Sequence, residues 1–228
     1  MDLTISVDEI LKGIDGVLVT HSHPDHFDTI SSKLLPKDIP IFATPTDKEF
    51  FAKQNFNNVT TIEKETTWSD IKIIRIEGQH GSGPILPFMG EVSGFVLQAK
   101  GEPTIYILSD TIITENVRDA ITHFQPQIII TNSGGGIFPG YEDFPVMVDE
   151  KQTIEIAKLA PNSKIISVHL ESIDFCRVTR KSLRNFANNN SITDEQLSIP
   201  NDGEEILIAV EKTTHHNNVS KLLPLRLL

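Results

Sequence analysis

The sequence predicts an α/β protein built as two packed β-sheets with helices on the outer faces. Short apolar runs bounded by turn residues recur along the chain, and two of them, 92–99 and 104–108, flank Gly101-Glu102-Pro103 as a hairpin. In the second half, apolar runs alternate with helical patterns. Hairpins early and helices alternating with strands later favour a β-sandwich core with outer helices.

The length supports a single folding unit. The 228 residues show no internal repeat and no low-complexity linker. We therefore expect one domain over residues 1–228, with no assignable element in the tail from about residue 213.

Caps and apolar runs define the elements of the N-terminal half. Ser6 and Glu9 form a capping-box pattern for a short helix that stops at Gly13. A second helix, introduced by Pro45, is expected over residues 46–54. Strands are expected over residues 17–19, 41–43, 59–62, 71–76, 92–99 and 104–108.

The C-terminal half alternates strands and helices. Helices are predicted over residues 114–124, 149–159 and 179–187, and strands over 128–130, 164–168 and 205–210. The glycine-rich segment 132–136 is expected to be a simple turn, although its backbone amides could also bind an anion. No helix follows it directly, so it is neither a P-loop nor a dinucleotide-binding fingerprint.

Composition excludes several partner classes. The formal net charge of −11, from 20 basic and 31 acidic residues, repels phosphate backbones and argues against nucleic acid. A small anionic substrate stays open, because bound cations dominate the local field of a site. No run approaches the roughly 18 apolar residues of a membrane helix. No signal-peptide pattern opens the chain, so we expect no membrane contact and a cytoplasmic location.

Cys176 is the only cysteine. An internal disulfide is therefore impossible, and a cysteine-based zinc site is excluded. Any metal ion must be held by histidine and carboxylate, and Cys176 itself is expected to be an inert core residue.

Good metal ligands follow four predicted strands. Loops at strand ends are where rigid scaffolds usually place functional groups. The strand at 17–19 leads into a cluster of three histidines and one aspartate, and the other three strands lead into one ligand each. The seven candidates are His21, His23, Asp25, His26, His80, Asp110 and His169.

The spacing in the first cluster suits two neighbouring ions. Residues two apart in an extended segment point the same way, so His21 and His23 can grip one ion. Pro24 then bends the chain and frees Asp25 and His26 to face a second ion. A lone histidine after a strand is ordinarily a hydrogen-bonded surface or core residue, but this crowding has no such explanation. Imidazole and carboxylate suit zinc, manganese or iron.

The ligand motifs resemble those of the metallo-β-lactamase superfamily. They are His21-Ser22-His23-Pro24-Asp25-His26, Gly78-Gln79-His80, Ser109-Asp110-Thr111 and Val168-His169. Within it, the chain is most similar to the branch of L-ascorbate-6-phosphate lactonase. That likeness rests on residues 15–20, on 132–135, and on 169–171 followed by Thr179-Arg180. The resemblance runs from about residue 6 to about residue 210.

The resemblance implies a ligand set and a reaction. His21, His23 and His80 would hold one ion, Asp25, His26 and His169 the other, and Asp110 would bridge them. The implied activity is a metal-dependent hydrolase that uses a hydroxide shared by two divalent ions, zinc first and manganese second. The implied substrate is a small-molecule ester or lactone. Asp25 would also orient the nucleophile, and Asp110 would fix the distance between the ions.

Two alternatives stay open from the sequence. The same metal centre could hydrolyse phosphodiesters, or the chain could be a non-catalytic, metal-stabilised binding module. Relatives carry several β-strands before the helix that here starts near Ser6. We therefore expect a shortened or differently completed sandwich and homo-oligomer formation through an exposed sheet edge.

Other residues receive weaker assignments. Asp174-Phe175 stands where relatives often have Asn-His, so substrate preference need not carry over. Arg177 and Arg180 are expected on the surface, although either could meet an anionic group. His123 is expected to cap a helix, and His215 and His216 lie in the polar tail.

Overall fold

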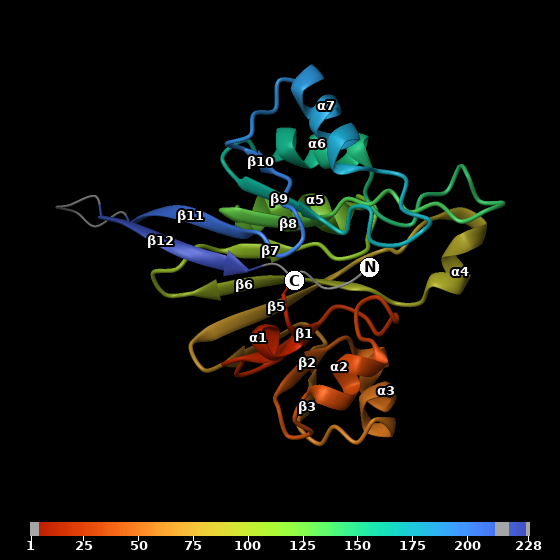
Figure 1. The fold of residues 1–228 in the computed structure, drawn as a ribbon, viewed down its shortest axis with the longest axis vertical. Helices are drawn as coiled ribbons and strands as arrows, with labels where there is room; N and C mark the ends of the chain where they lie inside the picture. The colour runs from red at the N-terminus through yellow and green to blue at the C-terminus, as the bar shows by residue number, and fades with distance from the viewer. Residues whose placement is uncertain (1–4, 213–218, 227–228) are drawn as a thin grey trace.

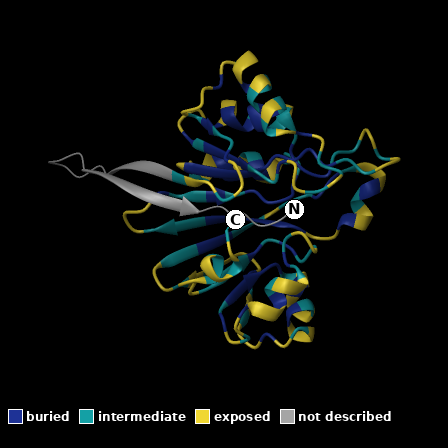
Figure 2. Cartoon of the chain, in the orientation of Figure 1, coloured by how far each residue is buried: buried dark blue, intermediate teal, exposed yellow. Residues whose placement is uncertain are grey.

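The computed structural model describes residues 5–212 and 219–226, with side chains up to Ile206. Two β-sheets lie at its centre and helices cover their outer faces (Figure 1). Buried residues concentrate on the sheets, while the helices are exposed on their outer sides (Figure 2). The predicted fold class, an αβ/βα sandwich, is confirmed.

The smaller sheet is parallel and has the order β1-β2-β3. Its strands are β1 (Val17–Val19), β2 (Ile41–Ala43) and β3 (Val59–Thr61). The helices of this layer are α1 (Val7–Leu11), α2 (Thr29–Leu34) and α3 (Lys48–Lys53), the last preceded by the 3₁₀ turn η1 (Pro45–Asp47). Phe27, Phe51 and Phe56 pack with β1 and β2 in one buried cluster, which fixes these helices against the sheet.

The larger sheet is mixed and has the order β10-β9-β8-β7-β6-β5-β4. Strands β4 to β7 are antiparallel neighbours, and β7 to β10 are parallel. The strands are β4 (Glu65–Trp68), β5 (Ile71–Glu77), β6 (Ser93–Ala99), β7 (Ile105–Ile107), β8 (Ile128–Asn132), β9 (Lys164–Val168) and β10 (Leu197–Ser198). The turn η2 (Gly83–Ile85) and helix α4 (Leu86–Met89) connect β5 to β6.

Three longer helices cover the outer face of this sheet. They are α5 (Glu115–Phe124), α6 (Glu150–Leu159) and α7 (Arg180–Asn189). Each begins where an N-cap side chain accepts a backbone N–H: Thr114, Asp149 and Thr179. Their apolar faces and the sheet share the largest buried cluster.

The two sheets meet through a separate core. Phe42 of β2 packs there with Ile73 and Phe95 of the large sheet and with Ile62. This core holds the small sheet, which carries one cluster of candidate ligands, against the large sheet, which carries the others.

A β-hairpin of β11 (Glu205–Lys212) and β12 (Val219–Arg226) extends from the body (Figure 1). The sequence predicted β11 as a strand over residues 205–210, but the tail from about residue 213 showed no hydrophobic periodicity that would predict β12. Residues 213–218, which include His215 and His216, lie outside the described part of the chain.

The expectation of early hairpins was wrong for the first three strands. They are parallel, because helix α2 joins β1 to β2 and helix α3 joins β2 to β3. The sequence also missed β4, α4 and β10, which are all short. None of the helices in the described ranges has the length and apolar character needed to cross a bilayer.

Candidate metal centre

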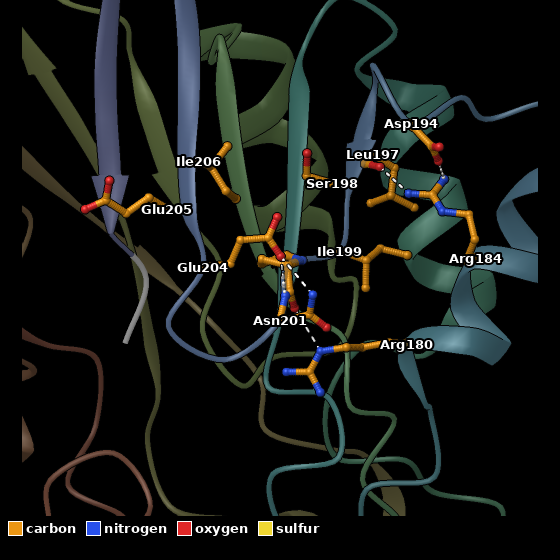
Figure 3. A pocket seen from close by; sticks show the side chains of 11 residues that line it. Arg180, Arg184, Asp194, Leu197, Ser198, Ile199, Asn201, Glu204, Glu205 and Ile206 are labelled. Carbon is orange, nitrogen blue, oxygen red and sulfur yellow. Dashed lines mark hydrogen bonds and ion pairs between the residues drawn. The ribbon is translucent and has the colours of Figure 1, made fainter. Parts of the chain in front are cut away.

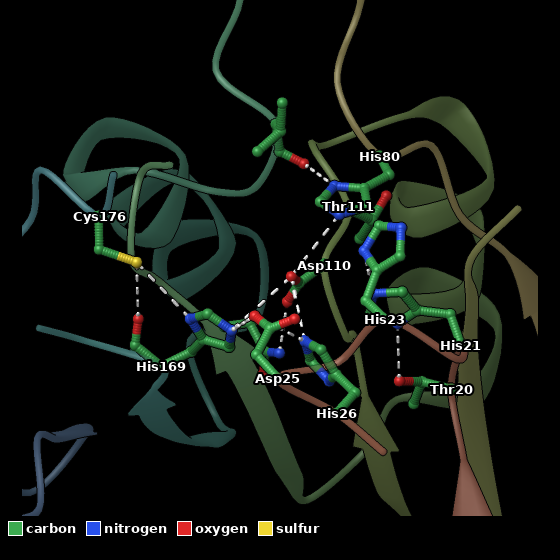
Figure 4. Close-up of polar contacts among 12 residues, drawn as sticks. Thr20, His21, His23, Asp25, His26, His80, Asp110, Thr111, His169 and Cys176 are labelled. Carbon is green, nitrogen blue, oxygen red and sulfur yellow. Dashed lines mark hydrogen bonds and ion pairs between the residues drawn. The ribbon is translucent and has the colours of Figure 1, made fainter. Parts of the chain in front are cut away.

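The seven candidate ligands lie at the ends of strands from both sheets. His21, His23, Asp25 and His26 follow β1 of the small sheet, and His80, Asp110 and His169 follow β5, β7 and β9 of the large one. Their ligand atoms fall into two groups, each within 4.8 Å: His21, His23 and His80, and Asp25, His26, Asp110 and His169. Figure 4 shows Asp110 between His80 on one side and His26 and His169 on the other.

The first group presents three ring nitrogens. Nε2 of His21 lies 3.1 Å from Nδ1 of His23. The other nitrogen of His21 hydrogen-bonds the hydroxyl of Thr20 at 3.2 Å. Nδ1–H of His80 donates to the carbonyl oxygen of Val146 at 2.7 Å, which leaves its Nε2 as an acceptor. Fixed partners therefore orient two of the three rings toward the shared point.

The second group combines imidazole and carboxylate. Nε2 of His169 is 3.2 Å from Oδ2 of Asp25, and Nε2 of His26 is 3.2 Å from Oδ2 of Asp110. Oδ2 of Asp110 is also 3.8 Å from Nε2 of His80 and from Nε2 of His169. This single oxygen thus lies close to members of both groups.

Burial keeps two histidines of the first group, His21 and His80, uncharged. It lowers the pKa of His21 to about 2, helped by the neighbouring His26, and it also lowers the pKa of His80. Both imidazoles are therefore neutral near pH 7. Neutral imidazole is the form that binds metal ions.

The carboxylates stay ionised. The hydrogen bond from His169 lowers the pKa of Asp25 to about 2. Burial opposes ionisation of Asp110, but the hydrogen bond and charge of His26 outweigh it and hold the pKa of Asp110 well below its usual range. Burial likewise opposes protonation of His169, and its bond to Asp25 outweighs this and raises the pKa of His169 to about 11. A metal ion between them would replace that proton.

The donor set fits divalent ions. It consists of imidazole nitrogens and carboxylate oxygens without thiolate, which suits zinc, manganese or iron. Two carboxylates among the candidate ligands, Asp25 and Asp110, would offset part of the positive charge of the bound ions. The loop backbones are also specialised here: Ser109 (φ 67°) and His169 (φ 60°) adopt left-handed conformations that non-glycine residues rarely do, as strand ends at functional sites often require.

The glycine-rich segment is more than a turn, because the loops after β8 and β9 meet at Gly134. A Cβ atom there would lie 2.4 Å from the carbonyl oxygen of His169 and 2.5 Å from Sγ of Cys176. Only glycine allows this approach.

The sequence missed three residues around the ligands. The side-chain amide of Asn132 donates to Oδ1 of Asp110 at 2.6 Å, and the Ser172 hydroxyl hydrogen-bonds Nδ1 of His169 at 2.9 Å. Cys176, expected in the core, is half-buried, and its Sγ is 3.7 Å from the same Nδ1. The motif containing Asn132 was visible in the sequence, but its contact with Asp110 was not.

A cavity of about 660 Å³ opens beside the second group. Asp25, His26 and His169 line one part of it. Apolar side chains from β1, β7, β8 and β9 line much of the rest, among them Leu18, Ile107, Ile130 and Val168. Its size and lining suit a small, largely apolar molecule.

The arginines nearby are not free to bind an anion. In a second cavity of about 510 Å³, Arg180 donates to the carbonyl oxygen of Pro200 and Arg184 pairs with Asp194 at 2.6 Å (Figure 3). Arg180 also pairs with Glu171 and Asp202. Arg180 is therefore half-buried and ties the loop after β9 to the loop after β10, whereas the sequence analysis expected a solvated surface residue.

The family model of the β-lactamase superfamily domain matches residues 4–170. The chain belongs to this superfamily. It is 34% identical to the UPF0173 protein YddR of Bacillus subtilis, over 90% of this chain and 80% of that one. A possible metal-dependent hydrolase from Veillonella parvula has 33% identity and a TM-score of 0.85, over 90% of this chain and 80% of that one.

An isothiocyanate hydrolase from Delia radicum gut bacteria is also similar. It shares 30% identity with a TM-score of 0.82, over 88% of this chain and 78% of that one. Together with relatives named metal-dependent hydrolases, these likenesses identify the chain as a metal-dependent hydrolase of the metallo-β-lactamase superfamily. They favour an enzyme over the non-catalytic binding module.

Proposed function

We propose that the protein binds two divalent ions, zinc or manganese, and hydrolyses a small-molecule ester or lactone. The observation that carries this proposal is the pair of ligand groups that meet at Oδ2 of Asp110 beside a cavity with apolar walls. Ions held there would supply Lewis acidity and an acidified water molecule. The net charge of −11 makes phosphodiesters of nucleic acids a weaker alternative.

The protein side chains have separable roles in this proposal. The rings of His21, His23 and His80 would hold one ion, and Asp25, His26 and His169 would hold the other. Asp110 lies between the groups and holds them at a fixed separation. Asp25 is partly exposed at the cavity and ionised, so its Oδ2 can accept a hydrogen bond from the attacking water and orient it.

A second candidate substrate class is the isothiocyanates. The similarity to an isothiocyanate hydrolase supports it, because that likeness covers most of both chains. An isothiocyanate offers an uncharged, electrophilic carbon on an organic group. The apolar walls of the cavity suit such a group.

A substrate panel tests these proposals. The zinc-loaded and manganese-loaded protein is assayed with γ- and δ-lactones, p-nitrophenyl esters, benzyl and allyl isothiocyanate, and bis-p-nitrophenyl phosphate. Asp110→Asn and His169→Ala should lose at least a hundredfold in kcat/KM, while His123→Ala, an exposed residue on α5, should match the wild type. Turnover of the phosphodiester alone, or activity that survives both ligand variants, would refute the proposal.

A further inference from the structure

The two oxygens of the Asp110 carboxylate have different surroundings. Oδ2 is 3.2 Å from Nε2 of His26 and 3.8 Å from Nε2 of both His80 and His169. Oδ1 instead accepts a hydrogen bond of 2.6 Å from the side-chain amide of Asn132. Only one of the two oxygens therefore faces histidines of both ligand groups.

The bond from Asn132 is well placed to hold this arrangement. Asp110 is 2% exposed and Asn132 is 8% exposed, so water competes little for the bond. A hydrogen bond to an ionised carboxylate is shorter and stronger than a neutral one. Asn132 ends the central strand β8 and is paired in register with Val168, which fixes its backbone.

We propose that Asn132 is a positioning residue of the metal centre: its amide holds Oδ1 of Asp110 so that Oδ2 alone faces the ions of both groups. The inference rests on the two-ion centre proposed above. Without the amide, the carboxylate can turn about its broad terminal torsion and offer both oxygens to one ion.

The two groups should not depend equally on this positioning. The first group keeps three histidines whatever Asp110 does. The second has only His26 and His169 besides its two carboxylates, so it depends more on the orientation of Asp110. The loss of the amide should therefore weaken the second ion selectively.

Metal titration of full-length variants tests this selectivity. Asn132→Leu removes the donor at similar size, and Asn132→Ser keeps a shorter donor. Asn58→Ala is the matched control, because its amide donates to the carbonyl oxygen of Asp38 on the exposed surface. Each protein is stripped with a chelator and titrated with Co²⁺ by visible absorption. Zinc content by mass spectrometry and the circular dichroism spectrum are measured in parallel.

The wild type and Asn58→Ala should bind two equivalents. Asn132→Leu should bind the first ion with an affinity within threefold of the wild type and the second ion at least tenfold more weakly. The affinity of Asn132→Ser for the second ion should lie between those of the wild type and Asn132→Leu. Unchanged binding of both ions by folded Asn132→Leu would overturn the inference but not the two-ion centre. Equal weakening of both ions in Asn132→Ser would indicate a structural role and overturn it too. A wild type that binds one ion or none would refute the centre itself.

Discussion

Replacement of Gly134 by alanine should damage the metal centre and the fold together. The new Cβ would lie 2.4 Å from the carbonyl oxygen of His169, whereas real Cβ contacts stay above 3.0 Å, so a backbone must move by more than about half an ångström. Metal sites tolerate displacements of only about 0.5 Å. Overpacking of this kind costs about 1–3 kcal/mol, or roughly 2–4 °C in Tm per kcal/mol for a chain of this size.

Thermal unfolding and metal titration measure the two effects of Gly134→Ala. We expect a lower Tm and at least tenfold weaker binding of the ion that involves His169. The double variant Gly134→Ala/Cys176→Ala should regain part of the lost Tm and of the lost metal affinity. The second substitution removes Sγ of Cys176, which would otherwise lie 2.5 Å from the new Cβ. Gly140→Ala is the control: nothing lies within 4 Å of its Cβ position, so only its positive φ should cost stability. Wild-type stability and metal binding in Gly134→Ala would refute the close-packing argument.

Three further changes test other parts of the structure. Burial raises the pKa of Asp47 and outweighs the hydrogen bond from Ser22. Above about pH 4 the native protein therefore binds more protons at this position than the unfolded chain does, and it loses stability as the pH rises through that window. Asp47→Asn should remove this loss, so its free energy of unfolding, measured by denaturant titration, should rise relative to that of the wild type as the pH increases. A constant difference between the two proteins across the pH range would contradict this prediction. Thr114→Ala removes the N-cap of α5 and should lower the free energy of unfolding by about 1 kcal/mol, with no change in metal content. Ser172→Ala removes the hydroxyl partner of Nδ1 of His169 and should weaken metal binding about tenfold, with the Tm of the metal-free protein unchanged; a lower Tm of the metal-free protein without a metal effect would argue for a packing role.

Local signals predicted most of the fold. The apolar runs at 17–19, 41–43 and 164–168 match β1, β2 and β9, and the helices expected over 114–124 and 179–187 correspond to α5 and α7. These features depend on neighbouring residues, which the sequence displays directly.

Features that depend on distant residues were not predictable. The parallel pairing of β1 with β2 was missed because the helix that joins them, α2, was too short to recognise. Likewise, the candidate ligands could be named from their motifs, but the bond from Asn132 to Asp110 joins the end of β8 to the loop after the neighbouring strand β7. The hydrophobic periodicity of a sequence does not indicate hydrogen bonds between residues that are far apart in the chain.

The ligand groups draw on both sheets, and this has a mechanical consequence. His23 follows a strand of the small sheet and His80 a strand of the large one; His26 and His169 are divided in the same way. Ions shared by these pairs would act as cross-links between the sheets, in a chain whose single cysteine cannot form an internal disulfide. Ions that bind the folded chain and not the unfolded one stabilise the folded state through their binding free energy. Depletion of the ions should therefore remove these links between the two sheets and leave the apolar core around Phe42 and Phe95 to hold the layers together.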